Sequence, residues 1–340
     1  MQILERQNYR VVSFEGSDQV GKGDALNFFS GKLIERGDVD IVTSSFPIYG
    51  TPIGSTIRVL LKEGGEKFNL DHREELEVKM ALFALNRLEF LEVFLEQDIS
   101  KEALVLFDRS AFSNALTIAY AMKEIPDMTS EDIEGLVKIA LDLDSLLIDT
   151  LSLNRCVVQP VIDGEEWHSS RDGEVDLHES PDVQKYAAFV YSLYQGIIED
   201  GWMRVPTKEK GVWRDREEIY SDIFGFVVER LGKIGSDGYK GKKYEVGIRE
   251  IVENIYVGSY VDEDLLQQYI GSIENNDKDT MYTTSIEVKN QICSSYDSIL
   301  FKNESIKEAF RTILSQYSKI EEVLEYNLGE EFVNNLEKAL

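Results

Sequence analysis

The feature that most constrains this chain is a glycine-containing run between a short apolar segment and a helix-like pattern. It follows residues 11–14 and reads EGSDQVGKGD over residues 15–24. Its glycines let the backbone turn amides inward, the next helix directs its positive end to the same place, and its lysine adds a movable cation. The spacing predicts a loop that binds a nucleotide polyphosphate through Gly16, Ser17, Asp18, Gly21, Lys22, Gly23 and Asp24. The simpler alternative is a glycine-rich turn before an ordinary helix.

One position of this loop departs from the usual pattern. Position 23, where a Ser or Thr hydroxyl usually reaches Mg²⁺, is glycine, and Asp24 follows it. Magnesium is therefore expected to be held by water, phosphates and carboxylates.

Composition excludes several classes of protein. With 340 residues, 43% of them hydrophobic, the chain is long enough for one large or two moderate domains. A formal net charge of -27 argues against general DNA or RNA binding. Its two cysteines, Cys156 and Cys293, are far apart, so neither a disulfide framework nor a zinc site is expected. No run has the length of a membrane span and no leader opens the chain, so we expect a cytoplasmic protein without membrane partners.

Strand-like and helix-like segments alternate along the first 231 residues. Apolar runs typical of strands lie at 9–14, 41–46, 103–107 and 202–205, and helical patterns lie at 22–36, 54–62, 73–96, 112–123, 130–141, 181–200 and 216–231. Two more apolar runs, 145–148 and 156–162, need supply only one central strand. We favour the second, because the first can end a long helix. This alternation predicts an α/β fold with a parallel sheet flanked by helices on both faces.

The character of the chain changes near Gly232. Residues 233–245 are rich in Gly and Lys and lack an apolar period, which indicates a linker. Helical patterns follow at 246–256, 262–273, 286–299 and 304–340, without a repeat or a catalytic signature. The sequence therefore predicts a phosphate-loop domain over 1–232, a linker over 233–245 and a mainly α-helical C-terminal domain of unknown role over 246–340.

Five pieces in a fixed order resemble the thymidylate kinase family of nucleoside monophosphate kinases. After the phosphate loop these pieces are FPIYGTPIG at 46–54, FALNR at 83–87, DRSAFSN at 108–114 and DLHE at 176–179. The resemblance covers about residues 9–231 and implies the P-loop NTPase fold. The C-terminal region has no counterpart in the usual compact member of the family.

The resemblance implies phosphoryl transfer between two nucleotides, in which positioning and charge neutralisation are nearly the whole mechanism. Lys22 and the loop amides would hold the phosphates of the donor, and Arg109 would grip the acceptor monophosphate. Asp18 would approach the metal and the acceptor's 3'-hydroxyl. Asp108, which ends a strand, would be a second partner of Mg²⁺ or of water.

Base recognition is expected on the helix at 73–96. Phe83 and Arg87 are spaced i, i+4 and share one helical face, and in the family the matching pair stacks on thymine and donates to its exocyclic oxygen. Phe83 alone would otherwise be read as a core aromatic. Asn114 matches a position that reads the pyrimidine edge, next to Ser113. The predicted substrate-binding residues are Phe46, Pro47, Phe83, Arg87, Arg109, Ser113, Asn114 and Glu179.

Residues 163–180 match the mobile lid of the family. Members without an arginine at the position of Gln19 tend to bring one from the lid, here Arg171, which would close over the transferring group and shut out water. Arg171 is otherwise a solvent-facing loop arginine. Asp176 and Glu179 resemble an acidic pair after the lid, or are acids favoured by the dipole at a helix start.

The resemblance thus implies an ATP- and Mg²⁺-dependent kinase that converts dTMP to dTDP for dTTP synthesis, as a homodimer packed through helices. Its catalytic residues would be Lys22, Arg109, Arg171 and Asp18. Two alternatives stay open. One is a kinase for another (deoxy)nucleoside monophosphate, because Ser110 and Thr117 stand where many members carry Tyr. The other is a weakly catalytic nucleotide-binding regulatory module whose C-terminal domain serves a protein partner.

Overall fold

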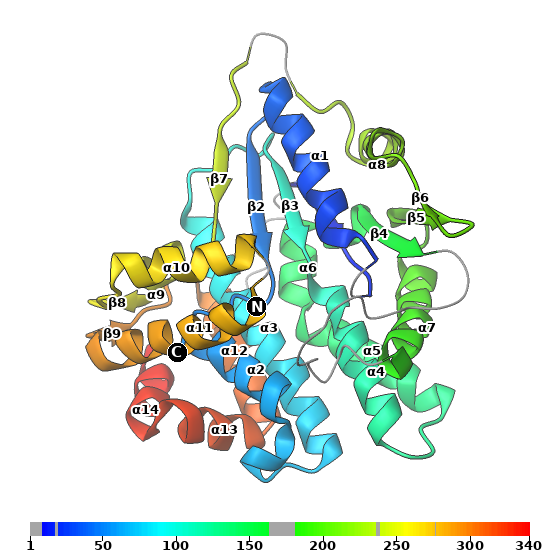
Figure 1. The fold of residues 1–340 in the computed structure, drawn as a ribbon. Coiled ribbons are helices and arrows are strands. Elements are labelled where there is room, and N and C mark those ends of the chain that lie inside the picture. The colour runs from blue at the N-terminus through cyan, green and yellow to red at the C-terminus, as the bar shows by residue number, and fades with distance from the viewer. Residues whose placement is uncertain (1–8, 18–19, 163–180, 236–238, 276) are drawn as a thin grey trace. The chain divides into compact units, whose positions relative to one another are not determined.

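The computed structural model describes residues 9–17, 20–162, 181–235, 239–275 and 277–340. Contacts divide the chain into two compact units, drawn as a ribbon in Figure 1. The sheet unit holds residues 9–46 and 99–245, and the helical unit holds residues 47–98 and 246–340. The C-terminal part of the helical unit begins at residue 246, where the C-terminal domain was predicted to begin, but residues 47–98, predicted to belong to the phosphate-loop domain, form one unit with it.

The sheet unit is built on seven strands in the order β6-β5-β4-β1-β3-β2-β7. All neighbouring pairs are parallel except β5 and β6, which form an antiparallel hairpin. The strands are β1 (Arg10–Phe14), β2 (Ile41–Ser45), β3 (Leu104–Asp108), β4 (Val157–Ile162), β5 (Trp202–Glu209), β6 (Val212–Trp213) and β7 (Lys243–Glu245). The helices are α1 (Lys22–Arg36), α4 (Asn114–Glu124), α5 (Ser130–Leu143), α6 (Ser145–Leu151), α7 (Pro181–Ile198) and α8 (Arg216–Leu231).

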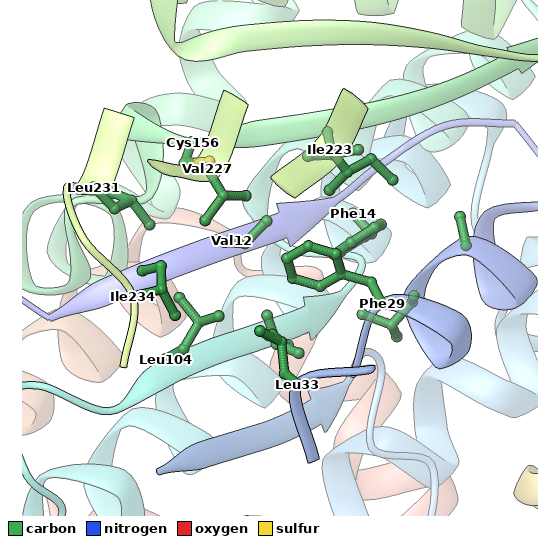
Figure 2. Close-up of a cluster of buried hydrophobic side chains, with 14 of the residues drawn as sticks. Val12, Phe14, Phe29, Leu33, Leu104, Cys156, Ile223, Val227, Leu231 and Ile234 are labelled. Carbon is green, nitrogen blue, oxygen red and sulfur yellow. The ribbon is translucent and has the colours of Figure 1, made fainter. Parts of the chain in front are cut away.

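Helices α1 and α8 cover one face of this sheet. Figure 2 shows Val12 and Phe14 of β1 and Leu104 of β3 in one buried cluster with side chains from both helices. The labelled helix residues of the cluster are Phe29, Leu33, Ile223, Val227 and Leu231. Apolar residues on the inner faces of both helices and on alternate strand positions account for this layer. Helices α4, α5 and α7 pack on one another in the same unit.

The predicted α/β fold with a parallel sheet and flanking helices is confirmed. A strand that leads through a glycine loop into a helix, as β1 leads into α1, is the P-loop arrangement. The choice between the two apolar runs is also confirmed, because 145–151 is helix α6 and 157–162 is strand β4.

The predicted linker contains a strand. Residues Lys243–Glu245 form β7 and pair in parallel with β2, in the register Ile41 to Lys243. The Asp40 carboxylate accepts hydrogen bonds from the Tyr239 hydroxyl at 2.8 Å and from the Lys242 amide at 2.8 Å. Three residues are too few for an alternation to show against a Gly- and Lys-rich background, so the sequence indicated only a linker.

The helical unit combines an internal segment with the C-terminal one. The internal segment forms α2 (Pro52–Glu63) and α3 (His72–Glu96). The C-terminal segment forms α9 (Ile248–Ile255), β8 (Tyr256–Val257), α10 (Glu263–Glu274), α11 (Lys278–Ser295), β9 (Ser298–Ile299), α12 (Glu304–Gln316), α13 (Lys319–Leu328) and α14 (Glu330–Ala339). Strands β8 and β9 pair antiparallel as a small second sheet.

Helix α3 lies at the centre of the helical unit. It begins with a capping box of Asp71 and Glu74 and then buries side chains on every face, against α2, α9, α12 and α13. A helix that is buried all round belongs to the interior of its unit. The C-terminal segment is therefore part of the core that surrounds α3.

Two expected helices of the C-terminal segment differ in the structure. The pattern at 286–299 was expected to be one helix, but α11 ends at Ser295 and β9 follows. The pattern at 304–340 forms three helices, with one break at residues 317–318 and another at Gly329, whose φ of 91° is left-handed. Among the helices described, none is both long and apolar enough to cross a bilayer.

Candidate functional site

The phosphate loop connects β1 to α1 in the sheet unit. Gly16 has φ +133° and Gly21 has φ +84°, and both angles favour glycine. Gly21 caps α1, which begins at Lys22, so the free amides of the first turn face the loop. A Cβ at Gly16 would also lie 3.1 Å from the Pro160 carbonyl oxygen. Two of the predicted loop glycines are therefore required by backbone geometry.

Gly23 is different from the other two loop glycines. It lies in the first turn of α1, and a Cβ added to it would meet no atom within 4 Å. Packing therefore leaves room for a side chain at this position. The absence of a hydroxyl there is a feature of the sequence and not a demand of the fold.

Lys22, Asp108 and Arg109 gather at this loop. Lys22 forms an ion pair through Nζ with Oδ1 of Asp108, the last residue of β3, which lies beside Phe14 in the β1–β3 register. Arg109 donates from Nη1 to the Gly16 carbonyl oxygen at 3.3 Å. Its φ of 69° is left-handed, which is uncommon for a residue with a side chain and often marks a functional site. The sequence predicted all three residues, and the structure brings them together.

A buried carboxylate lies under the same loop. Glu15 is fully buried, and it accepts hydrogen bonds from the hydroxyls of Ser110 at 2.6 Å and of Ser113 at 2.5 Å. The Ser13 hydroxyl lies 3.0 Å from the same carboxylate. Ser113, predicted to bind substrate, is therefore hydrogen-bonded to Glu15. No role was predicted for Glu15, although an acid directly after a buried strand is an unusual pattern that could have indicated one.

Tyr191 of α7 supports the loop from another side. Its hydroxyl donates to the Gly16 carbonyl oxygen at 3.3 Å, and burial raises the pKa of this tyrosine well above its ordinary value. The phenol therefore stays protonated and remains a donor at neutral pH. No sequence motif pointed to this residue.

Thr207 and Trp213 complete the surroundings of the loop. The Thr207 hydroxyl donates to the Val20 carbonyl oxygen at 2.7 Å and so fixes the end of the loop. Trp213 on the β5–β6 hairpin is 57% exposed, and Cζ3 of its ring would lie 3.5 Å from a Cβ at Gly21. Lys208 Nζ lies 5.6 Å from the centre of this ring. No sequence motif pointed to either residue: Thr207 lies beyond the apolar run at 202–205, and Trp213 lies on a two-residue strand, which is too short to show a pattern.

Other predicted residues of the sheet unit have different surroundings. Asp24 is exposed and lies 3.3 Å from Arg216. Phe46 is buried, and its ring packs against Phe107 with centroids 5.4 Å apart. Asn114 is 1% exposed and opens α4.

The two ends of the Asn114 amide differ. Its Nδ2 donates to Asp144 at 3.3 Å. Its Oδ1 is buried, and none of the described residues hydrogen-bonds to it. A buried carbonyl oxygen without a partner is costly, so Asn114 Oδ1 is a candidate acceptor for a ligand.

The two residues predicted to read the base belong to the helical unit. Arg87 is 2% exposed on α3, and Phe83 is half-buried one turn earlier on the same helix. Pro47 precedes α2 in the same unit. Burial of a guanidinium in the interior of a unit is unusual and limits its movement, so Arg87 is structurally constrained.

Glu89 is a titratable group beside this pair. It is fully buried on α3, and burial raises its pKa to about 7. Hydrogen bonds from Tyr256, Thr51 and Asn86 oppose this rise only in part. The carboxyl group is therefore expected to titrate near neutral pH, and no sequence motif pointed to it.

Several predicted residues cannot be placed. Asp18, Arg171, Asp176 and Glu179 lie outside the described residues. Within the described residues, no group of three or more His, Cys, Asp and Glu side chains is arranged to hold a metal ion. A surface groove of about 670 Å³ between β5 and α8 is lined by Arg204, Asp222, Arg230 and others, and it contains none of the predicted site residues.

Parts of the chain are similar to known thymidylate kinases. Residues 14–128 match the family model described as thymidylate kinase. A curated thymidylate kinase from Cupriavidus pinatubonensis is 29% identical over 111 residues, which are 33% of this chain and 49% of that protein. The chain thus spans about half the length of this curated relative. A solved structure of thymidylate kinase from Candida albicans is similar with a TM-score of 0.46 and 19% identity, over 67% of this chain and 96% of that chain.

Proposed function

We propose that this chain, whose residues 14–128 match the thymidylate kinase family model, is a kinase that transfers the γ-phosphoryl group of ATP to dTMP, giving dTDP. The observation that carries this proposal is the grouping of Lys22, Asp108 and Arg109 at the phosphate loop. Two cations and a carboxylate at the carboxyl ends of neighbouring parallel strands suit a transfer between anionic groups.

The donor would bind at the β1–α1 loop. Amides between Gly16 and Lys22 would hold its phosphates, and the Lys22 ammonium would leave Asp108 for the β and γ phosphates. The indole of Trp213 is an exposed flat surface next to Gly21, and we assign it to the purine ring of the donor. Stacking of a base on an aromatic ring is indifferent to base identity, so this contact would add affinity more than selectivity.

The acceptor would be held by its phosphate and by its base. Arg109 would grip the monophosphate as a two-pronged donor. Asn114 Oδ1, which none of the described residues satisfies, would accept from the N3–H of a pyrimidine. Phe83 and Arg87 would stack on the ring and donate to its exocyclic oxygen.

Magnesium fits the residues present. Mg²⁺ prefers oxygen ligands and is commonly bound by one or two carboxylates together with substrate phosphates, and Asp108 supplies a carboxylate at the strand end. The ion would neutralise charge on the phosphate oxygens. Asp18 is proposed as a second carboxylate for the same ion, and no hydroxyl is present at position 23 to help them.

The chain's own residues would carry the transfer by position and charge. An oxygen of the acceptor phosphate forms the new bond to the γ-phosphorus while the bond to the β–γ bridging oxygen breaks, and ADP leaves with that electron pair. Lys22 and Arg109 would balance the charge on both sides of the transferring group, and Arg171 is proposed as a third cation from the lid. No general base is needed, because the phosphate of a nucleoside monophosphate has a second pKa of about 6 and is largely ionised at neutral pH.

A panel of acceptors tests the proposal. Purified protein with ATP and Mg²⁺ is assayed against dTMP, dUMP, dGMP and AMP, and dTDP formation is followed directly. We expect dTMP to have the highest kcat/KM, and we expect Lys22→Ala to lower it by about a hundredfold or more. Lys101→Ala, which removes an exposed side chain before β3 and outside the predicted site, is the matched control and should stay near wild type.

The two alternatives give different results in the same assay. A clear preference for dUMP, dGMP or AMP would assign the chain to another monophosphate substrate. ATP binding without transfer to any acceptor, at enzyme concentrations above those of the acceptor, would favour a regulatory nucleotide-binding module. Either result would overturn the proposed reaction.

A further inference from the structure

The C-terminal segment reaches the loop that precedes α2 inside the helical unit. The amide of Gly50 donates to the Tyr269 hydroxyl oxygen at 2.8 Å, and both residues are buried. A Cβ at Gly50 would lie 3.0 Å from side-chain atoms of Ile248 and of Tyr269. The path of this loop is thus shaped by two residues of the C-terminal segment.

A second contact joins the same loop and α3 to strand β8. The Tyr256 hydroxyl donates to Oε1 of Glu89. The other oxygen, Oε2, accepts from the Thr51 hydroxyl at 2.8 Å and from Asn86 Nδ2 at 2.9 Å. Asn86 in turn accepts from the Ile48 amide at 2.8 Å. All five residues are buried, so water does not replace a lost partner.

Further along the helices the C-terminal segment makes two more polar contacts. Glu92 of α3 accepts from the amide of Lys302 at 2.5 Å and from that of Asn303 at 3.2 Å. Asn327 donates to the Thr56 hydroxyl of α2 at 2.8 Å. Both helices are therefore held at several points along their length by one segment.

Two residues of this network flank, along α3, the residue proposed to read the base. Arg87 lies between Asn86 and Glu89 on α3, and both neighbours belong to the buried network. A buried guanidinium has little freedom of its own, so its direction follows the position of the helix that carries it. A shift of α3 or of the 48–51 loop would move Arg87 and Phe83 together.

We propose that the C-terminal segment, residues 246–340, is a structural part of the acceptor site, with Tyr256 and Tyr269 as positioning residues that set the 48–51 loop and α3. This inference rests on the proposed kinase function. It assigns the extra segment a role inside the enzyme, in place of the role of a separate partner-binding module. Neither tyrosine touches the nucleotide; each acts through Glu89 or Gly50.

The test removes only the two hydroxyl groups. Tyr256→Phe, Tyr269→Phe and the double variant are compared with wild type for KM of dTMP, KM of ATP and kcat, and for dTMP affinity by calorimetry. We expect the KM and Kd of dTMP to rise about tenfold in the double variant, while the KM of ATP stays within about twofold. Tyr260→Phe, at a largely exposed tyrosine of the same segment, is the matched control and should equal wild type.

The KM values distinguish a role of the two tyrosines in positioning from a role in protein stability alone. A merely structural loss would reduce the active fraction, which lowers apparent kcat and leaves both KM values unchanged. An unchanged KM of dTMP in the folded double variant would overturn the positioning role. If the double variant does not fold, the KM of dTMP in the two single variants is the test. Absence of dTMP turnover in the wild type would instead count against the proposed kinase function.

Discussion

Asp108 holds the Nζ of Lys22 in an ion pair at the end of β3, with both side chains largely shielded from water. A lysine and an acid paired across a phosphate loop keep the cation beside the place where phosphates would bind. The pair therefore links the donor lysine to the carboxylate that we assign to Mg²⁺.

Asp108→Asn should weaken the use of Mg²⁺ more than the binding of nucleotide. The amide keeps the size of the side chain but loses the charge that attracts the cation. We expect the Mg²⁺ concentration at half-maximal activity to rise about tenfold, with the KM of dTMP nearly unchanged. Asp142→Asn, an exposed acid of α5, is the control. Equal Mg²⁺ dependence in both variants would contradict the assignment.

A hydroxyl at position 23 should be accepted by the fold and used by the metal. Because a Cβ at Gly23 meets nothing within 4 Å, Gly23→Thr and Gly23→Ala should both fold. Each should gain a few tenths of a kcal/mol to about 1 kcal/mol in helix stability. Only the Thr variant carries the hydroxyl that usually reaches Mg²⁺, so only it should need less Mg²⁺ for half-maximal activity. Matching Mg²⁺ curves for the Thr and Ala variants would show that this hydroxyl does not reach the ion.

The elements marked by local signals could be predicted from the sequence. Helices α1 and α8 have the predicted bounds, because glycines end their patterns: Gly21 and Gly37 cap α1, and Gly232 caps α8. The grouping of Lys22, Asp108 and Arg109 was also predictable, because parallel strands bring their carboxyl ends to one edge.

Contacts between distant segments could not be predicted in this way. Strand β7 has three residues and pairs with a strand about two hundred positions earlier, so nothing local marks it. The Tyr256–Glu89 hydrogen bond joins two residues whose patterns indicate only helices, and periodicity does not say which tyrosine meets which acid. The same holds for the 47–98 segment, whose partners lie at the other end of the chain.

Trp213 should report on the donor base. We expect ATP to change the fluorescence of the wild type, and inorganic tripolyphosphate, which has no base, to leave it unchanged. Trp213→Phe should abolish the signal and keep most of the affinity, and Trp213→Ala should raise the KM of ATP about tenfold, as the loss of one stacked ring predicts. Trp167 and Trp202 remain in both variants, so a signal that persists in Trp213→Phe would refute this placement of the base.

Glu89 should make the stability of the protein depend on pH between its ordinary pKa of 4.5 and its folded value of about 7. The folded state holds the proton more tightly than the unfolded chain, so stability is greatest below about pH 4.5 and falls as pH rises towards 7. The loss is on the order of 3 kcal/mol, and no further loss from this group is expected above its folded pKa.

Glu89→Gln mimics the protonated acid and should remove this part of the pH dependence. Urea unfolding at pH 5, 6, 7 and 8 measures it as the difference between wild type and variant, which cancels the other titrating groups. That difference should grow in favour of the variant from pH 5 to pH 7 and then stay level. Glu325→Gln, at an exposed acid of α13, is the control, and its free energy of unfolding should change with pH as that of wild type does. If the free energy of unfolding of Glu89→Gln also changes with pH as that of wild type does, the buried carboxyl does not titrate in this range. The effect of its hydrogen bonds on its pKa would then outweigh the effect of desolvation.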